Sequence, residues 1–298
     1  MSLNIQSLSV VVSNKECINK CPFCVSRMTG NNEYENRMAL NHPHYDINVR
    51  EYLKRLKYVA GNGCQAIILT GTSEPQQNKQ FLATFALLHQ QIGSPFHNIE
   101  MQTTGMLLED NRDYLRFLRN FVGVNTIALS LNSLSDEMNN AVLECKIPGK
   151  YLTVQHLCDQ LKEYDFNIRI CCNLTSKFNL DDNMPPAIFR HFRDNLHADQ
   201  VTFRKMYTSE KDTPQGKWLS ENPFPEQQHL ELKSYLKTFP VIGHTVYGTE
   251  IRDVNGMSVV YDSDCMGKEP KNGALKYLIL RPNCKLYSQW DSKASLVF

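Results

Sequence analysis

The sequence predicts an α/β fold built around a parallel sheet. Strand-like and helix-like segments alternate over roughly the first two hundred of the 298 residues, which is typical of right-handed βαβ crossovers. The alternation gives six strand–helix units, fewer than the eight of a closed (β/α)₈ barrel. Hydrophobic residues make up 42% of the chain and charged residues 21%, so the composition is that of an ordinary globular protein.

Each expected strand is a short apolar or β-branched run, and the six runs cover residues 7–13, 66–69, 99–102, 126–131, 166–174 and 201–205. The helices between them follow the 3.6-residue period. The first should bury Val49, Leu53, Leu56 and Ala60 and end at Gly61. The third should begin near Asp110 as its N-cap and bury Tyr114, Phe117, Leu118 and Phe121. The other helices are expected around residues 81–91, 154–164 and 186–195.

The last third of the chain has a different character. Residues 206–225 are polar and contain proline, which predicts a loop or lid before a helix with Leu232, Tyr235, Leu236 and Phe239. Short β segments follow at residues 241–247, 258–261, 275–280 and 285–288, with a hairpin turn at residues 281–284. We therefore divide the chain into a core at residues 1–210 and a C-terminal α+β extension at residues 211–298, which would close the core and help select the substrate.

The charge balance excludes several classes of partner. Lysine and arginine total 32 against 31 acidic residues, so no strong field attracts duplex DNA or a membrane surface. The sequence shows neither a secretory signal nor an apolar stretch long enough to span a bilayer. Ten cysteines without such a signal indicate a reducing compartment, and we expect a cytoplasmic location.

Three cysteines lie close together after the first expected strand. Cys17, Cys21 and Cys24 follow a Cys-x₃-Cys-x₂-Cys spacing, and the next cysteine is Cys64. Three thiolates on a [4Fe–4S] cluster leave one iron without a protein ligand, so that iron can bind a small molecule.

With Phe23 directly before the last cysteine, this spacing resembles the radical S-adenosylmethionine (radical SAM) superfamily. The resemblance implies an open, partial (β/α)₆ TIM-like barrel. It also implies that Cys17, Cys21 and Cys24 hold a [4Fe–4S] cluster whose fourth iron is chelated by SAM. Cleavage of SAM would give methionine and a 5′-deoxyadenosyl radical that abstracts hydrogen from a substrate. An electron donor such as flavodoxin or ferredoxin is implied as well.

The turn after the second strand, at residues 70–75, resembles the Gly-Gly-Glu-Pro motif that holds the SAM amino group in this family. Gly71 and Glu74 match the motif, whereas Thr72 and Ser73 replace its second glycine. Glycine lets a backbone approach a ligand closely. Thr104 closes the third strand and resembles the Thr-Asn-Gly strand end near the family's cluster.

Alternation along the last three core strands places polar side chains on one face. These are Ser130 and Asn132, then Arg169, Cys171 and Asn173, then Thr202, Arg204 and Met206. Ligands of parallel barrels lie at the carboxyl ends of the strands, and the resemblance implies that this face binds SAM. We assign Ser130 and Arg169 to the SAM carboxylate or ribose, Asn173 to the ribose and the Met206 backbone to adenine. No catalytic acid, base or hydrogen donor is assigned.

The alternative is a non-catalytic module that binds zinc or an iron–sulfur cluster. Zinc would need a fourth ligand, and His42 and His44 are the nearest candidates. Cys265 and Cys284 are too few to hold an auxiliary cluster.

Arg112, Arg116 and Arg119 form a basic stripe that is typical of a solvated helix face, with docking of an acidic peptide or an RNA as the alternative. The substrate stays open between a small molecule, a nucleotide and a peptide.

Overall fold

The computed structural model describes residues 4–12, 16–28, 48–178, 180, 185–207, 212–245, 248–263, 274–290 and 292–298. Its centre is a run of six neighbouring parallel strands: β2 (Leu8–Val11), β3 (Ala66–Thr70), β4 (Asn98–Thr103), β5 (Thr126–Leu131), β6 (Asn167–Leu174) and β7 (Gln200–Lys205). These are the six strands that the sequence predicts, so the α/β class with a mainly parallel sheet is confirmed.

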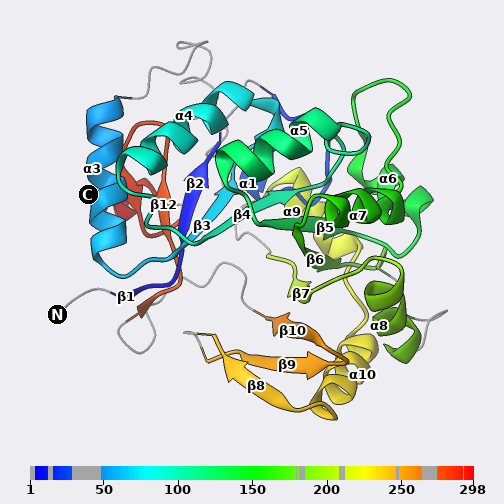
Figure 1. Cartoon of the computed structure of the whole chain (residues 1–298). Coiled ribbons are helices and arrows are strands. Elements are labelled where there is room, and N and C mark those ends of the chain that lie inside the picture. Colours follow the sequence, from blue (N-terminus) through cyan, green and yellow to red (C-terminus); the bar gives the residue numbers. More distant parts are fainter. Residues whose placement is uncertain are drawn as a thin grey trace.

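The C-terminal part of the chain adds strands to both edges of this sheet (Figure 1). β10 (Met257–Asp262) pairs parallel with β7, and β9 (Glu250–Val254) and β8 (Val241–His244) follow in antiparallel order. At the opposite edge β12 (Leu278–Leu280) pairs parallel with β2, and β13 (Leu286–Tyr287) returns antiparallel. The order is β13-β12-β2-β3-β4-β5-β6-β7-β10-β9-β8, and the sheet is not closed.

A separate parallel pair joins β1 (Asn4–Ile5) to β11 (Ala274–Leu275). The residues after 240 therefore lengthen the sheet at both ends, and the division of the chain near residue 210 stays a prediction. Neither β1 nor β9 is expected from the sequence. β9 was missed because Glu250, Arg252 and Asp253 leave it without an apolar alternation.

Helices occupy the expected connections: α3 (Val49–Gly61), α4 (Lys79–Gln91), α5 (Arg112–Arg116), α7 (Val154–Glu163), α8 (Pro185–Asp194) and α10 (Glu226–Lys237). Two helices are not expected from the sequence, α6 (Asp136–Leu143) and the short α1 (Val25–Met28), and neither are the turns at Pro75–Gln77 and Lys293–Ser295. The prediction of only a loop or lid at residues 206–225 is wrong, because the helix α9 (Pro214–Glu221) lies within this segment. Thr213 caps α9 by accepting a hydrogen bond from the Gly216 N–H at 3.1 Å, and Pro214 takes the first helical position.

The buried face of α3 largely matches the expected one, since Leu56 is buried and Leu53 and Ala60 are half-buried against the core. Tyr52, Leu56 and Val59 are buried, whereas Val49 at the first position of the helix is 46% exposed. The Tyr52 ring lies edge-on to Phe81 of α4, with centroids 6.3 Å apart. Tyr52 and Val59 thus add to the expected face, and Val49 lies outside it.

The N-cap and the buried face of α5 differ from the expected ones. Asn111, not Asp110, caps the helix by accepting from the Tyr114 N–H at 3.2 Å. The chain then widens into a π-helical turn at Phe117–Val122, which shifts the period so that Leu115, Leu118 and Val122 are buried. Phe121, expected inside, is 40% exposed.

The two faces of the central sheet have different chemistry. One face carries Ile67, Leu69, Ile99, Met101 and Ile127, which belong to the main hydrophobic core. The opposite face is polar, because alternate positions carry residues such as Ser130, Arg169 and Arg204. Among the described residues, no helix is long and apolar enough to cross a membrane.

Candidate functional site

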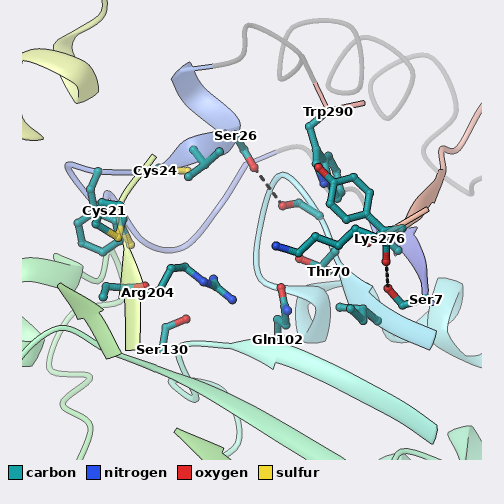
Figure 2. Close-up of a pocket in the computed structure, with 18 of the residues that line it drawn as sticks. Ser7, Cys21, Cys24, Ser26, Thr70, Gln102, Ser130, Arg204, Lys276 and Trp290 are labelled. Atoms are coloured by element: carbon teal, nitrogen blue, oxygen red, sulfur yellow. Dashed lines mark hydrogen bonds between the residues drawn. The ribbon is translucent and has the colours of Figure 1, made fainter. Parts of the chain in front are cut away.

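A pocket of about 380 Å³ lies against the polar face of the sheet (Figure 2). Nine residues selected from the sequence line it: Cys21, Phe23, Cys24, Gly71, Ser130, Arg169, Asn173, Arg204 and Met206. The structure thus brings together the cysteine loop and the ends of strands β3 and β5–β7. Six other selected residues do not line it: Cys17, Thr72, Ser73, Glu74, Thr104 and Asn132.

The cysteine loop runs from Cys17 to Cys24, and all three thiols are free and partly exposed. Burial, together with the nearby Glu74 carboxyl, raises the pKa of Cys17 to about 11. Burial and then the Cys24 thiol raise the pKa of Cys21. Phe23 is buried against Trp218 of α9, with ring centroids 5.9 Å apart. The loop is therefore packed into the fold.

Asn19, between the first two cysteines, fastens the loop to the core. Its backbone forms a β-bridge with Cys145, and its side-chain amide donates to Glu74 (3.3 Å) and Thr104 (3.0 Å). The Asn19 carbonyl accepts from Arg27 at 3.1 Å. The sequence analysis did not select Asn19, because nothing in its spacing separates it from an ordinary loop residue.

Glu74 lies beneath this loop and is buried. Its carboxylate accepts from the Thr103 hydroxyl at 2.6 Å and from the Thr104 N–H at 3.1 Å. Burial raises the pKa of Glu74, and the hydrogen bonds from Thr103, Thr104 and Asn19 oppose that shift. Glu74 and Thr104 thus connect the cysteine loop to the ends of β3 and β4, and neither reaches the pocket.

Gly71 does reach the pocket, and its lack of a side chain has a clear cause. A Cβ at this position would lie 2.4 Å from the Val12 carbonyl oxygen, so a larger residue would separate the ends of β2 and β3. The Gly71 carbonyl accepts from Ser26 at 3.2 Å (Figure 2). Thr72 has a buried hydroxyl with no hydrogen-bond partner among the described residues.

The polar strand ends form two linked layers. Arg169 donates to Glu100 at 2.8 Å and to the Thr202 hydroxyl at 3.0 and 3.1 Å, so its guanidinium is held at the floor of the pocket. The charge of Glu100 is the main factor that raises the pKa of Arg169. One layer above, Asn173 donates to Asn132 at 2.9 Å. Asn132 therefore supports Asn173 from outside the pocket lining.

Arg204 of β7 points into the pocket (Figure 2). Its Nε is buried and has no hydrogen-bond partner among the described residues. A buried donor without an acceptor is costly, so this position is suited to an anionic group of a ligand.

A second group of residues lines the pocket without having been predicted from the sequence: Gln6, Ser7, Ser9, Val25, Ser26, Ile68, Thr70, Gln102, Lys276, Tyr277 and Trp290. Thr70 ends β3 and Gln102 lies near the end of β4, both on the polar face, so alternation along the two strands could have identified them. Nothing local marks Lys276, Tyr277 or Trp290, because they reach the pocket only through the pairing of β12 with β2.

The remaining predicted features lie elsewhere. The basic stripe forms ion pairs with acidic neighbours, with Arg112 to Glu163 at 3.7 Å and Arg119 to Asp165 at 2.7 Å, as expected of a solvated face. The predicted hairpin turn at Arg281–Cys284 joins β12 to β13, and Cys284 is buried in it. His42, His44 and Cys265 lie outside the described residues.

The donor set fits a [4Fe–4S] cluster and SAM. The thiols are near enough that Cys24 and Cys17 both raise the pKa of Cys21, and the Arg204 Nε suits the carboxylate of SAM. Within the described part of the chain, no three Cys, His, Asp or Glu side chains form a site for one metal ion. A four-iron cluster makes a different demand, since its thiolates bind separate irons.

Comparisons with known proteins agree with this site. A family model described as the Radical SAM superfamily matches residues 11–183, more than half of the chain. No curated protein matches the sequence. Among solved structures, anSMEcpe, determined with bound AdoMet (SAM), is 14% identical with a TM-score of 0.58, and the match covers 97% of this chain and 75% of that one.

Coproporphyrinogen III oxidase (HemN) from Escherichia coli, described as a radical SAM enzyme, is also 14% identical. Its TM-score is 0.49, with 79% of this chain and 52% of that one covered. The likeness to anSMEcpe supports the open barrel fold, and the family model supports the assignment of the cysteine loop. The chain belongs to the radical SAM superfamily.

Proposed function

We propose that this enzyme cleaves SAM reductively and uses the resulting radical on a substrate bound in the same pocket. As a radical SAM enzyme it uses a [4Fe–4S] cluster and SAM. When bound, these supply the electron and the 5′-deoxyadenosyl radical that abstracts hydrogen from the substrate. The observation that carries the proposal is that Cys21 and Cys24 line one pocket with polar side chains from β5, β6 and β7.

In this proposal Cys17, Cys21 and Cys24 hold the cluster. Cys17 does not line the pocket, but it lies close enough to Cys21 on the same loop to raise the pKa of that thiol. Asn19 and Glu74 hold the loop in place. The buried phenyl ring of Phe23 excludes water beside Cys24.

We further propose that Arg204, rather than Arg169, binds the SAM carboxylate. Glu100 and Thr202 already engage the Arg169 guanidinium, whereas Arg204 Nε is buried without a partner among the described residues. Ser130 and Asn173 line the adjacent wall and are suited to the ribose hydroxyls. The backbone at Met206 stays our candidate for adenine.

A flavodoxin or ferredoxin as electron donor and a cytoplasmic location belong to the same proposal. The alternative is a non-catalytic module that binds zinc or an iron–sulfur cluster. The family assignment argues against it. Such a module also has no use for the polar strand ends that line the pocket.

The test is anaerobic reconstitution of the chain, followed by iron counting, EPR with and without SAM, and assay of 5′-deoxyadenosine. We expect about four irons per chain, a SAM-induced change in the EPR spectrum, and cleavage product. Cys24→Ser should lose the cluster and the product. Cys145→Ser is the matched control, because Cys145 is a partly exposed thiol that pairs with the same loop through Asn19. Retention of product in Cys24→Ser, or no SAM-induced change in the unsubstituted protein, would refute the proposal.

A further inference from the structure

The pocket has two ends that come from different parts of the chain. Figure 2 shows Cys21 and Cys24 on one side and Lys276 and Trp290 on the other, with Gln102 between them. Lys276 and Trp290 lie well beyond the residues 11–183 that match the family model. The end opposite the cysteines is therefore built partly by residues outside the segment that matches the family model.

Three cationic side chains occur among the described lining residues, and they differ in their surroundings. Arg169 is neutralised by Glu100 in the floor at 2.8 Å. Arg204 lies toward the cysteine end. Lys276 enters from the opposite wall and points into the pocket (Figure 2), where its ammonium lies 3.6 Å from the Asp262 carboxylate.

Asp262 sits between the two remaining cations. The β7–β10 register places it beside Arg204, and the ion pair places it beside Lys276. The 3.6 Å separation from Lys276 is longer than a charge-assisted hydrogen bond. The Asp262 carboxylate thus lies beside two of the cationic side chains that line the pocket.

An aromatic surface adjoins Lys276. The rings of Tyr277 and Trp290 lie 6.4 Å apart at an interplanar angle of 51°. Arg281 fixes this surface, because it donates to the Trp290 carbonyl at 2.8 Å and its guanidinium lies 5.1 Å from the Tyr287 ring. Aromatic walls with a few polar groups are typical of small-molecule pockets.

We propose that this end binds a small substrate with an anionic group, a carboxylate or a phosphate, which Lys276 binds while Tyr277 and Trp290 pack against an adjacent ring or apolar part. Gln102 lines the same pocket; its amide donates one N–H to Glu100 at 3.2 Å and has a second N–H that can donate to the anionic group. The inference rests on the proposed function, since it assumes that SAM occupies the cysteine end.

The test is isothermal titration calorimetry on the reconstituted, full-length protein under anaerobic conditions with SAM present. The probes are benzoate, phenyl phosphate and the neutral benzamide. We expect at least one anionic probe to bind about tenfold more tightly than benzamide, and the comparison of the two anions identifies which group is preferred. Lys276→Met should weaken binding of the preferred anion by about tenfold.

For Asp262→Asn we expect the opposite change in anion binding, because the substitution removes a carboxylate that competes with the anion for Lys276. Binding of the anionic probe should tighten by about threefold, and binding of benzamide should not change. Lys285→Met is the control, since Lys285 is exposed and outside the pocket lining. A purely structural role for Lys276 and Asp262 would change anion binding in the same direction in both variants, and that result would overturn the proposal.

Titration of SAM alone separates this inference from the proposed function. If the unsubstituted protein fails to bind SAM, the proposed function fails. If it binds SAM, and both anions bind no better than benzamide, only the inference about the substrate fails.

Discussion

The central strands and the C-terminal strands of one sheet are specified in different ways. Strands β2–β7 are apolar runs separated by helices, and each pairs with a neighbour one βα unit away in sequence. In contrast, β12 pairs with β2 across the length of the chain, and β10 joins β7 after two helices. The core supplies the cysteines and Arg204, whereas the extension supplies Lys276 and Trp290. We propose that the core provides the radical chemistry and the extension adapts the pocket to a substrate.

The largest expected effect lies in the core, at Glu74. Glu74→Ala leaves the Thr104 N–H and the Asn19 amide without their buried acceptor. Each such loss costs about 1–3 kcal/mol, so we expect the free energy of unfolding to fall by about 3 kcal/mol. Because Asn19 fastens the cysteine loop, the iron content after reconstitution should fall as well. Urea denaturation and iron counting measure the two effects.

Glu109→Ala is the matched control for Glu74. Glu109 is also a buried carboxylate, and it accepts from the Thr153 N–H at 2.9 Å, away from the cysteine loop. This variant should lose stability but keep its iron. Equal iron content in the two variants would show that Glu74 stabilises the fold without positioning the cluster.

A smaller effect is expected in the extension, at Arg281. Arg281→Met removes the hydrogen bond to the Trp290 carbonyl and the contact with the Tyr287 ring. We expect a loss of about 1–2 kcal/mol in the free energy of unfolding, and a red shift of Trp290 fluorescence as its ring gains water. The chain has two tryptophans, so a Trp218→Phe background isolates the signal of Trp290.

Lys285→Met again serves as the control, because it removes a cation from the same turn but from an exposed position. Its fluorescence should match that of the parent. An unchanged spectrum in Arg281→Met would mean that β12 and β13 hold the aromatic wall without the guanidinium.

The sequence predicts the core strands and the polar face well, because alternation is a local property. Arg169 and Arg204 were both placed on the correct face. The sequence could not show that Arg169 is paired with a carboxylate and Arg204 is not. That pairing depends on Glu100, which lies on β4 and reaches Arg169 only in the folded sheet. Lys276 and Trp290 were missed for a related reason: their position depends on β12 pairing with β2, and a sequence pattern does not encode that long-range contact.

The smallest expected effect is on the pH dependence of stability. It uses one buried histidine in the core and one in the extension to test whether the two regions unfold together. His89 of α4 accepts from the Phe96 N–H at 3.2 Å between the rings of Phe85 and Phe96, and His229 of α10 is hydrogen-bonded to Tyr261. Burial lowers the pKa of both. The folded state therefore binds fewer protons than the unfolded state, whose histidines titrate near pH 6.5. Their stabilisation is present above that pH and is lost as the pH falls toward the lowered pKa.

His89→Gln and His229→Gln should each reduce the difference in free energy of unfolding between pH 7.5 and pH 5.5, by about 1 kcal/mol. His156→Gln should instead increase this difference, since the hydrogen bond that His156 donates to the Asp110 carboxylate raises the pKa of this exposed histidine. Because β10 pairs with β7 over five residue pairs, both buried histidines should affect a single urea transition. A separate transition that responds to His229→Gln but not to His89→Gln would show that the strands beyond β7 unfold independently, and the extension would then be an autonomous unit attached to the core.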